Sequence, residues 1–128
     1  MNWTEFLESI QLNLEDMTKI SDEGQMQGMS NILIDKLNSL DIFKRPVHCS
    51  DIKKEIIYVK DEDKWELEDE ERTKLRNALN SIIRKSIQTL AGMNRHPDDY
   101  VNTVSEIYKE PREDKKIISK LAKEVFVE

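Results

Sequence analysis

The central segment of the chain, residues 45–67, constrains the fold most, because it has the two-residue periodicity of β-strands. It begins with Arg45, which precedes a proline and is therefore biased towards extended backbone. Alternating and β-branched residues then predict strands over residues 47–51, 55–60 and 64–67, with three acidic residues forming the last turn. Three such strands predict an antiparallel meander, which needs a helix on one face to be stable.

The alternation also predicts which side chains share a face of the sheet. Val47, Cys49 and Asp51 lie on one side of the first strand, while His48 and Ser50 lie on the other. The side chains that we expect on the covered face of the whole sheet are Val47, Cys49, Ile57 and Val59.

On both sides of this segment, apolar residues recur at the three- and four-residue spacing of helices. Helices are predicted over residues 3–10, in a short turn after a cap at Asn13, over 22–40, over 69–91, from 97 onward, and over 117–126 to the end of the chain. Four acidic residues, 68–71, open the longest helix, where they would interact favourably with its positive end. Gly24 and Gly28 indicate either a close approach of another backbone or a bent helix start, and we favour the bent start.

Together these patterns predict a single domain, residues 1–128, of the α+β class. The domain is mostly helical, and a small three-stranded antiparallel meander, about residues 45–67, packs on the long helix, about residues 69–91. We expect Trp65 to be at least half buried where the meander closes onto that helix. With 38% hydrophobic and 36% charged residues, the chain has enough apolar surface for one modest core.

The charge and the cysteine content narrow the range of partners. The net charge is −6, which disfavours general binding to nucleic-acid backbones, since such binding needs a concentrated basic face. A lone cysteine cannot form an internal disulfide, so a reducing intracellular setting fits best. The sequence has no apolar run of the roughly 20 residues that a membrane helix needs, and its first residues lack the pattern of a secretion signal. We therefore expect no membrane partner.

Two groups of residues invite a chemical function, and each has a simpler explanation. His48 and Cys49 are neighbours in a strand, so their side chains point to opposite faces and cannot easily share one metal ion or one proton. The acidic stretch of residues 61–71 lacks the glycine and the terminal glutamate of a calcium-binding loop, and it is typical of a solvated turn and helix start. We therefore predict no catalytic residue, no cofactor and no metal site, and we do not expect an enzyme.

The meander carries the residues that we expect to contact a partner. They are Arg45, His48, Lys54, Tyr58, Lys60 and Trp65. Lysines beside a tyrosine and a tryptophan form a pattern that can bind nucleic acid, although the neighbouring acidic residues weaken its field. The alternative is an edge strand that lysines protect from pairing with another sheet.

The same segment resembles part of a known family. Lys-Arg-Pro-Val-His-Cys-Ser-Asp at residues 44–51, followed by Lys54-Glu55, Tyr58-Val59-Lys60 and Lys64-Trp65, resembles a domain at the C-terminal end of uncharacterised proteins of giant, nucleocytoplasmic large DNA viruses. Residues 28–38 and 117–125 are similar to the flanking segments of that domain. Family members often carry a zinc finger or a coiled coil upstream, and this sequence contains neither. The resemblance implies a viral context and no particular activity.

These observations lead to one functional expectation: a non-catalytic interaction and assembly module of a large DNA virus protein. It would act in the host cytoplasm or the viral factory, or in the virion. The alternative is a nucleic-acid-associated protein of viral replication or transcription. The partner would be a protein, including a second copy in a homodimer through the apolar stripe of residues 75–90 or of residues 117–126. Both stripes could instead close the core of the chain itself.

Overall fold

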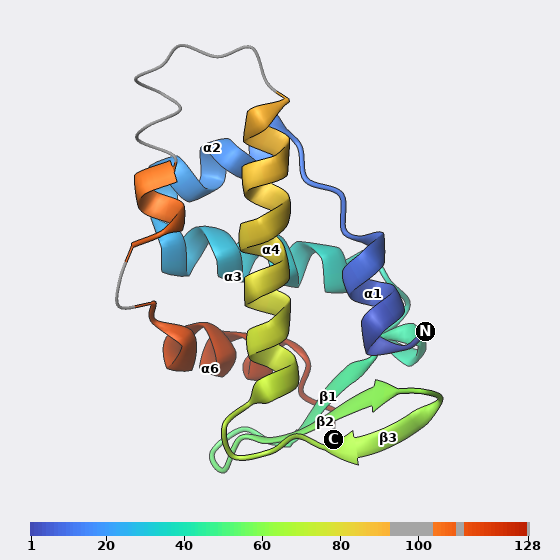
Figure 1. Cartoon of the computed structure of the whole chain (residues 1–128). Helices are drawn as coiled ribbons and strands as arrows, with labels where there is room; N and C mark the ends of the chain where they lie inside the picture. The colour runs from blue at the N-terminus through green and yellow to red at the C-terminus, as the bar shows by residue number, and fades with distance from the viewer. Residues whose placement is uncertain (93–103, 110–111, 128) are drawn as a thin grey trace.

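A three-stranded antiparallel sheet lies at one end of the protein, and the helices extend from it (Figure 1). The computed structural model describes residues 1–92, 104–109 and 112–127. The helices are α1 (Trp3–Ser9), α2 (Leu14–Glu23), α3 (Gln25–Asn38), the short 3₁₀ helix η1 (Ile42–Lys44), α4 (Thr73–Ala91) and α6 (Asp114–Glu124). The strands are β1 (Val47–Asp51), β2 (Ile56–Asp61) and β3 (Lys64–Leu67). The helix predicted from residue 97 starts outside the described residues, and residues 104–107 are helical.

The predicted fold class is confirmed, because the protein is mostly helical and its sheet is antiparallel with the strand order β1-β2-β3. Val47 lies opposite Val59, and Cys49 lies opposite Ile57. All four side chains are at most 1% exposed, as the alternation predicts. A β-bulge after Cys49 shifts the register, so that Asp51 lies opposite the first residue of β2. The prediction that Asp51 shares the face of Val47 and Cys49 is therefore wrong.

Two helices from distant parts of the chain lie against the sheet. α1 packs on β2, and α6 packs on β1. α4 reaches the sheet with its first turn and then runs away from it, as Figure 1 shows. The predicted packing of the meander on the long helix is thus limited to the N-terminal end of α4.

The apolar stripes of α4 and α6 are used inside the chain itself. Their core side chains are Leu75, Ala78, Leu79, Ile82, Leu90, Ile117, Ile118, Leu121 and Ala122. Each of them is at most 3% exposed. Most of both stripes therefore closes the chain's own core, while Ile83 and Ile87 of α4 remain partly exposed. The expected homodimer contact through these stripes stays a prediction.

The chain after α6 joins the sheet through a β-bridge between Phe126 and Cys49. α6 ends at Glu124. The N–H of Cys49 donates to the carbonyl of Val125 at 2.9 Å, and the N–H of Val127 donates to the carbonyl of Cys49 at 2.9 Å. The helix predicted over residues 117–126 is therefore wrong at its last two residues, because β1 offers hydrogen-bond partners to the backbone there.

Glycines determine how α2 and α3 meet. Gly24 has a φ of +90°, which glycine adopts without strain, and it separates α2 from α3. The helix predicted over residues 22–40 therefore starts after this break, and the turn predicted after Asn13 is the ten-residue α2. At Gly28 a Cβ would lie 2.7 Å from the Cα of Ile20. The close approach explains Gly28, so the preference for a bent start alone is wrong.

We expect Gly28→Ala to lower the free energy of unfolding by about 1–3 kcal/mol, the usual penalty for overpacking. The reason is that the added Cβ would meet the backbone of Ile20. Gly92→Ala is the matched control, because its Cβ would lie 3.7 Å from the carbonyl oxygen of Thr89, an ordinary contact. Urea unfolding of both variants measures the difference. Wild-type stability of Gly28→Ala would contradict the close approach.

The start of α4 lies later than predicted, at Thr73 instead of residue 69. Arg72 has a left-handed backbone, with a φ of +58°, which a right-handed helix cannot include. Two of the preceding acids cap the helix from outside: Glu68 Oε2 accepts from the N–H of Leu75 at 3.0 Å, and Asp69 Oδ1 accepts from the N–H of Thr73 at 3.0 Å. The acids therefore act on the positive end of the helix through hydrogen bonds.

Hydrogen bonds from the backbone and the side chain of Thr73 hold the pKa of Asp69 below its usual value of 3.8. Such a carboxylate stabilises the folded state above its usual pKa, and this contribution is lost as the pH falls through the lower folded-state pKa. Asp69→Asn keeps an oxygen that can accept from Thr73 but removes the titration. We expect it to reduce the loss of thermal stability between about pH 5 and pH 3. An unchanged acid dependence of the melting temperature would contradict this role.

Polar side chains also join helices that are far apart in the sequence. Lys85 of α4 donates to the carbonyls of Leu7 and Ile10, at 2.6 and 2.7 Å, where α1 ends. Gln25 of α3 donates to the carbonyl of Ile107 at 2.8 Å. These donors bind carbonyls at the C-terminal ends of helices. They hold α1 against α4, and the turn containing Ile107 against α3.

Candidate functional site

The side of the sheet that faces away from the core carries mostly aromatic and apolar side chains. The strand register also places Ile56 on this side, and we call five of the residues there the outer face: His48, Tyr58, Lys60, Trp65 and Leu67. Tyr58 is 38% exposed, Trp65 is 43% exposed and Leu67 is 61% exposed. Because the solvated face of an antiparallel sheet is ordinarily polar, an exposed aromatic face indicates a binding surface.

A ring stack organises the outer face. The rings of His48 and Trp65 have centroids 4.7 Å apart and planes inclined by 19°. Since β1 and β3 lie on either side of β2, the two rings meet above the middle strand. His48 Nε2 also lies 3.4 Å from the carbonyl oxygen of Ile42 in η1. The stack holds Trp65 in one orientation, so a partner that binds it would lose little side-chain entropy.

Trp65 is at least half buried, as predicted, but the long helix is not what covers it. Its exposed fraction of 43% means that slightly more than half of the residue is covered, and His48 provides cover on the outer face. Glu66, the next residue, is the one that faces α4, where it forms an ion pair with Lys74 at 3.6 Å. Because adjacent strand residues point to opposite sides, Trp65 points away from the long helix.

The short helix η1 adds further exposed apolar surface next to His48. Phe43 is 90% exposed and Ile42 is 44% exposed. Neither of these residues, nor Leu67, is predicted from the sequence as a partner contact. The signal in the sequence is weak: two apolar residues, flanked by charged ones, fit neither the helical nor the strand periodicity.

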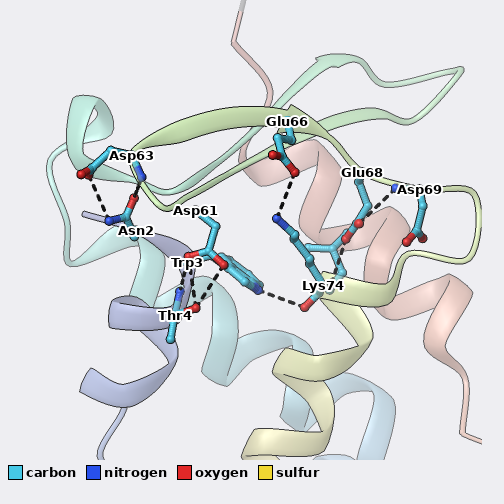
Figure 2. A network of polar contacts seen from close by, with 10 residues as sticks. Asn2, Trp3, Thr4, Asp61, Asp63, Glu66, Glu68, Asp69 and Lys74 are labelled. Carbon is cyan, nitrogen blue, oxygen red and sulfur yellow. Dashed lines mark hydrogen bonds and ion pairs between the residues drawn. The ribbon is translucent and has the colours of Figure 1, made fainter.

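The N-terminal end of α1 fixes the β2–β3 hairpin that carries Trp65 (Figure 2). Asn2 Nδ2 donates to Asp63 Oδ1 at 3.1 Å, and the N–H of Asp63 donates to Asn2 Oδ1 at 2.9 Å. The hydroxyl of Thr4 donates to Asp61 Oδ1 at 3.1 Å. Two of the three acids in this turn are thus bound to the end of α1.

Two of the six predicted contact residues lie apart from the outer face. Arg45 Nε donates to the carbonyl of Leu37 at 3.0 Å, so it caps the C-terminal end of α3. Lys54 lies in the β1–β2 turn and lines a cleft of about 250 Å³ together with basic and acidic side chains of neighbouring segments. The other four predicted residues lie together on the outer face.

The sheet separates the two side chains that invited a chemical interpretation. Cys49 is on the buried face with no exposed surface, and burial raises the pKa of its thiol. His48 is on the outer face and stacks on Trp65. Within the part of the chain that the structure describes, no group of three or more His, Cys, Asp or Glu side chains is arranged to hold a metal ion.

We expect Cys49 to react slowly with iodoacetamide in the native protein, because the thiol is buried and its raised pKa leaves little thiolate at neutral pH. Labelling should accelerate sharply once denaturant unfolds the chain. Mass spectrometry of timed samples measures both rates. Native labelling as fast as that of the unfolded protein would rule out the buried position.

The two tryptophans differ in exposure, at 2% for Trp3 and 43% for Trp65. Iodide should therefore quench part of the native fluorescence, and Trp65→Phe should remove the part that is quenched. Trp3→Phe is the matched variant, whose remaining emission should be quenched readily. If Trp65→Phe leaves the quenched fraction unchanged, the position of Trp65 on the outer face is wrong.

No helix among residues 1–92, 104–109 and 112–127 is long and apolar enough to cross a membrane. Comparisons of the chain with protein-family models, with curated proteins and with solved structures find no match.

Proposed function

We propose that this protein is a non-catalytic interaction module that binds a partner protein through the outer face. The observation that carries the proposal is the exposed pair of Trp65 and Tyr58 on an open sheet face. Tryptophan and tyrosine are enriched among the residues that dominate the energy of protein–protein binding. A contiguous exposed patch of such residues is typical of an interaction site.

The outer face is organised before any partner binds. The stack with His48 orients Trp65, and hydrogen bonds to the end of α1 fix the hairpin. Next to this rigid face, Phe43 projects from η1 with 90% of its surface exposed. A fixed aromatic platform beside a protruding side chain suits a partner that offers an apolar groove or pocket, since little ordering is needed on this side.

The viral setting of this proposal comes from the resemblance of residues 44–65 to the C-terminal domain of large DNA virus proteins. In that setting the partner would be another protein of the virus or of its host. The module would assist assembly, in the viral factory of the host cytoplasm or in the virion. The outer face supports the binding role, and the resemblance alone supports the viral one.

Single-stranded nucleic acid is the second candidate ligand, and the position of Lys60 favours it. An open sheet face with aromatic rings beside a cation is an arrangement on which nucleic-acid bases stack. The net charge of −6 opposes binding through the phosphates. We therefore place the protein partner first and a role in viral replication or transcription second.

Trp65→Ala and Phe43→Ala test the protein partner. Proteins captured by the wild-type chain from infected cells are identified and purified, and their dissociation constants are measured with each variant. Each variant should weaken binding at least tenfold, about 1.4 kcal/mol, as expected for a residue that dominates an interface. Tyr108→Ala is the control, because Tyr108 is 55% exposed but follows the helical residues 104–107, away from the outer face.

If Trp65→Ala and the wild type bind every purified candidate equally, the proposed function is wrong. Titration with a single-stranded oligonucleotide tests the second candidate in the same way. Quenching of Trp65 fluorescence that weakens steeply as salt is added would favour nucleic acid over a protein partner.

A further inference from the structure

Within the described part of the chain, β3 forms an open edge of the sheet. The N–H of Glu68 donates to the carbonyl of Ile57 at 2.8 Å, so these two residues form a hydrogen-bonded antiparallel pair. By the alternation of such pairs along the register, the even-numbered residues of β3 also bond to β2. The N–H and C=O groups of Trp65 and Leu67 therefore point away from β2, towards the edge.

The two edges of the sheet differ in what lies next to them. The edge at β1 is occupied by residues 125–127, which bond to Cys49. At β3, the indole of Trp65 lies over β2 because it stacks on His48, so it does not cover the edge of its own strand. All four residues of β3 are exposed. The edge at β3 is therefore accessible to another strand.

The charges on β3 select its partner. Lys64 and Glu66 are two residues apart on the same side of the strand, and the side chain of Glu66 is 61% exposed despite its ion pair with Lys74. We propose that β3 pairs in antiparallel orientation with β3 of a second copy of this chain, with the two Trp65 residues opposite each other. Lys64 of each copy then lies opposite Glu66 of the other. This inference rests on the proposed function and identifies one partner of the module.

The register centred on Trp65 is the one that the charges favour. It creates two pairs of opposite charge across the strands, and such directly opposed pairs stabilise a sheet. It also lets the two Trp65 residues exchange both of their free backbone hydrogen bonds. A register centred on Glu66 would place like charges opposite each other, which destabilises the pair. Charges on an edge strand usually prevent pairing, but here their alternating sign makes the strand complementary to itself.

Pairing in this way would extend the binding surface of the module. A two-fold axis perpendicular to the sheet keeps the outer faces of both copies on the same side. The result is one continuous sheet of six strands, three from each copy. Both Trp65–His48 stacks would lie on one surface, so a partner could contact two copies at once.

Charge reversal on β3 tests the inference. Sedimentation velocity over a micromolar concentration series should show the mass rising from 15.1 kDa towards twice that value. Lys64→Glu or Glu66→Lys alone should weaken the dimer about tenfold, because each substitution changes two symmetric contacts into like-charge pairs. The double variant, Lys64→Glu with Glu66→Lys, exchanges the two charges and should restore wild-type association.

Lys74→Ala is the control, because it removes the ion pair of Glu66 within one chain but no contact of the proposed dimer. It should leave the association unchanged, and the melting temperature of every variant reports whether the fold is intact. A wild-type mass of 15.1 kDa at all concentrations would overturn the inference. A double variant that associates no better than the single variants would also overturn it.

The two proposals can fail separately. Residues 64 and 66 lie on the side of β3 opposite to Trp65, so their charge reversal leaves the outer face itself unchanged. A monomeric wild type that still loses its protein partner in Trp65→Ala would remove the dimer and keep the proposed function. A dimer that is weakened by charge reversal but binds no partner protein through Trp65 would keep the dimer and remove the proposed function.

Discussion

The backbone of β1 needs hydrogen-bond partners on both of its sides, and much of the arrangement of the chain follows from how they are supplied. β2 satisfies one side, and residues 125–127 satisfy the other through Cys49. This second pairing draws α6 onto the sheet next to β1. Because one edge is then occupied, β3 remains as the edge with free backbone groups. One requirement for backbone pairing thus positions the C-terminal helix and determines where the sheet is open.

The two faces of the same sheet have opposite roles. The inner face, with Val47 and Val59 fully buried, is covered by helices and contributes to the core. On the outer face, Tyr58 and Trp65 remain partly exposed, because they point away from the core. Polar residues at these positions would serve solubility better. The proposed binding of a partner would account for this aromatic composition, which is the physical basis for treating the outer face as the candidate site.

The candidate site could be predicted in part from the sequence. Strand alternation places His48, Tyr58, Lys60 and Trp65 on one side, because neighbouring residues in a strand point to opposite faces. The apolar residues of the other side also predicted which face the helices cover, but no pattern predicted that Phe43 is exposed next to the sheet. The hydrogen bond of Arg45 at the end of α3 could not be predicted either, because it depends on a contact that no local pattern reveals.

The sequence by itself determined the elements whose signal is local. These are the helical and strand periodicities and the acids that precede α4, since each depends on neighbouring residues along the chain. Only the tertiary structure decided that Phe126 forms a β-bridge with Cys49, that Gly28 admits the backbone of Ile20, and that the ring of Trp65 stacks on His48. Each of these features joins separate segments of the chain, so it contributes to stability only once the chain has folded.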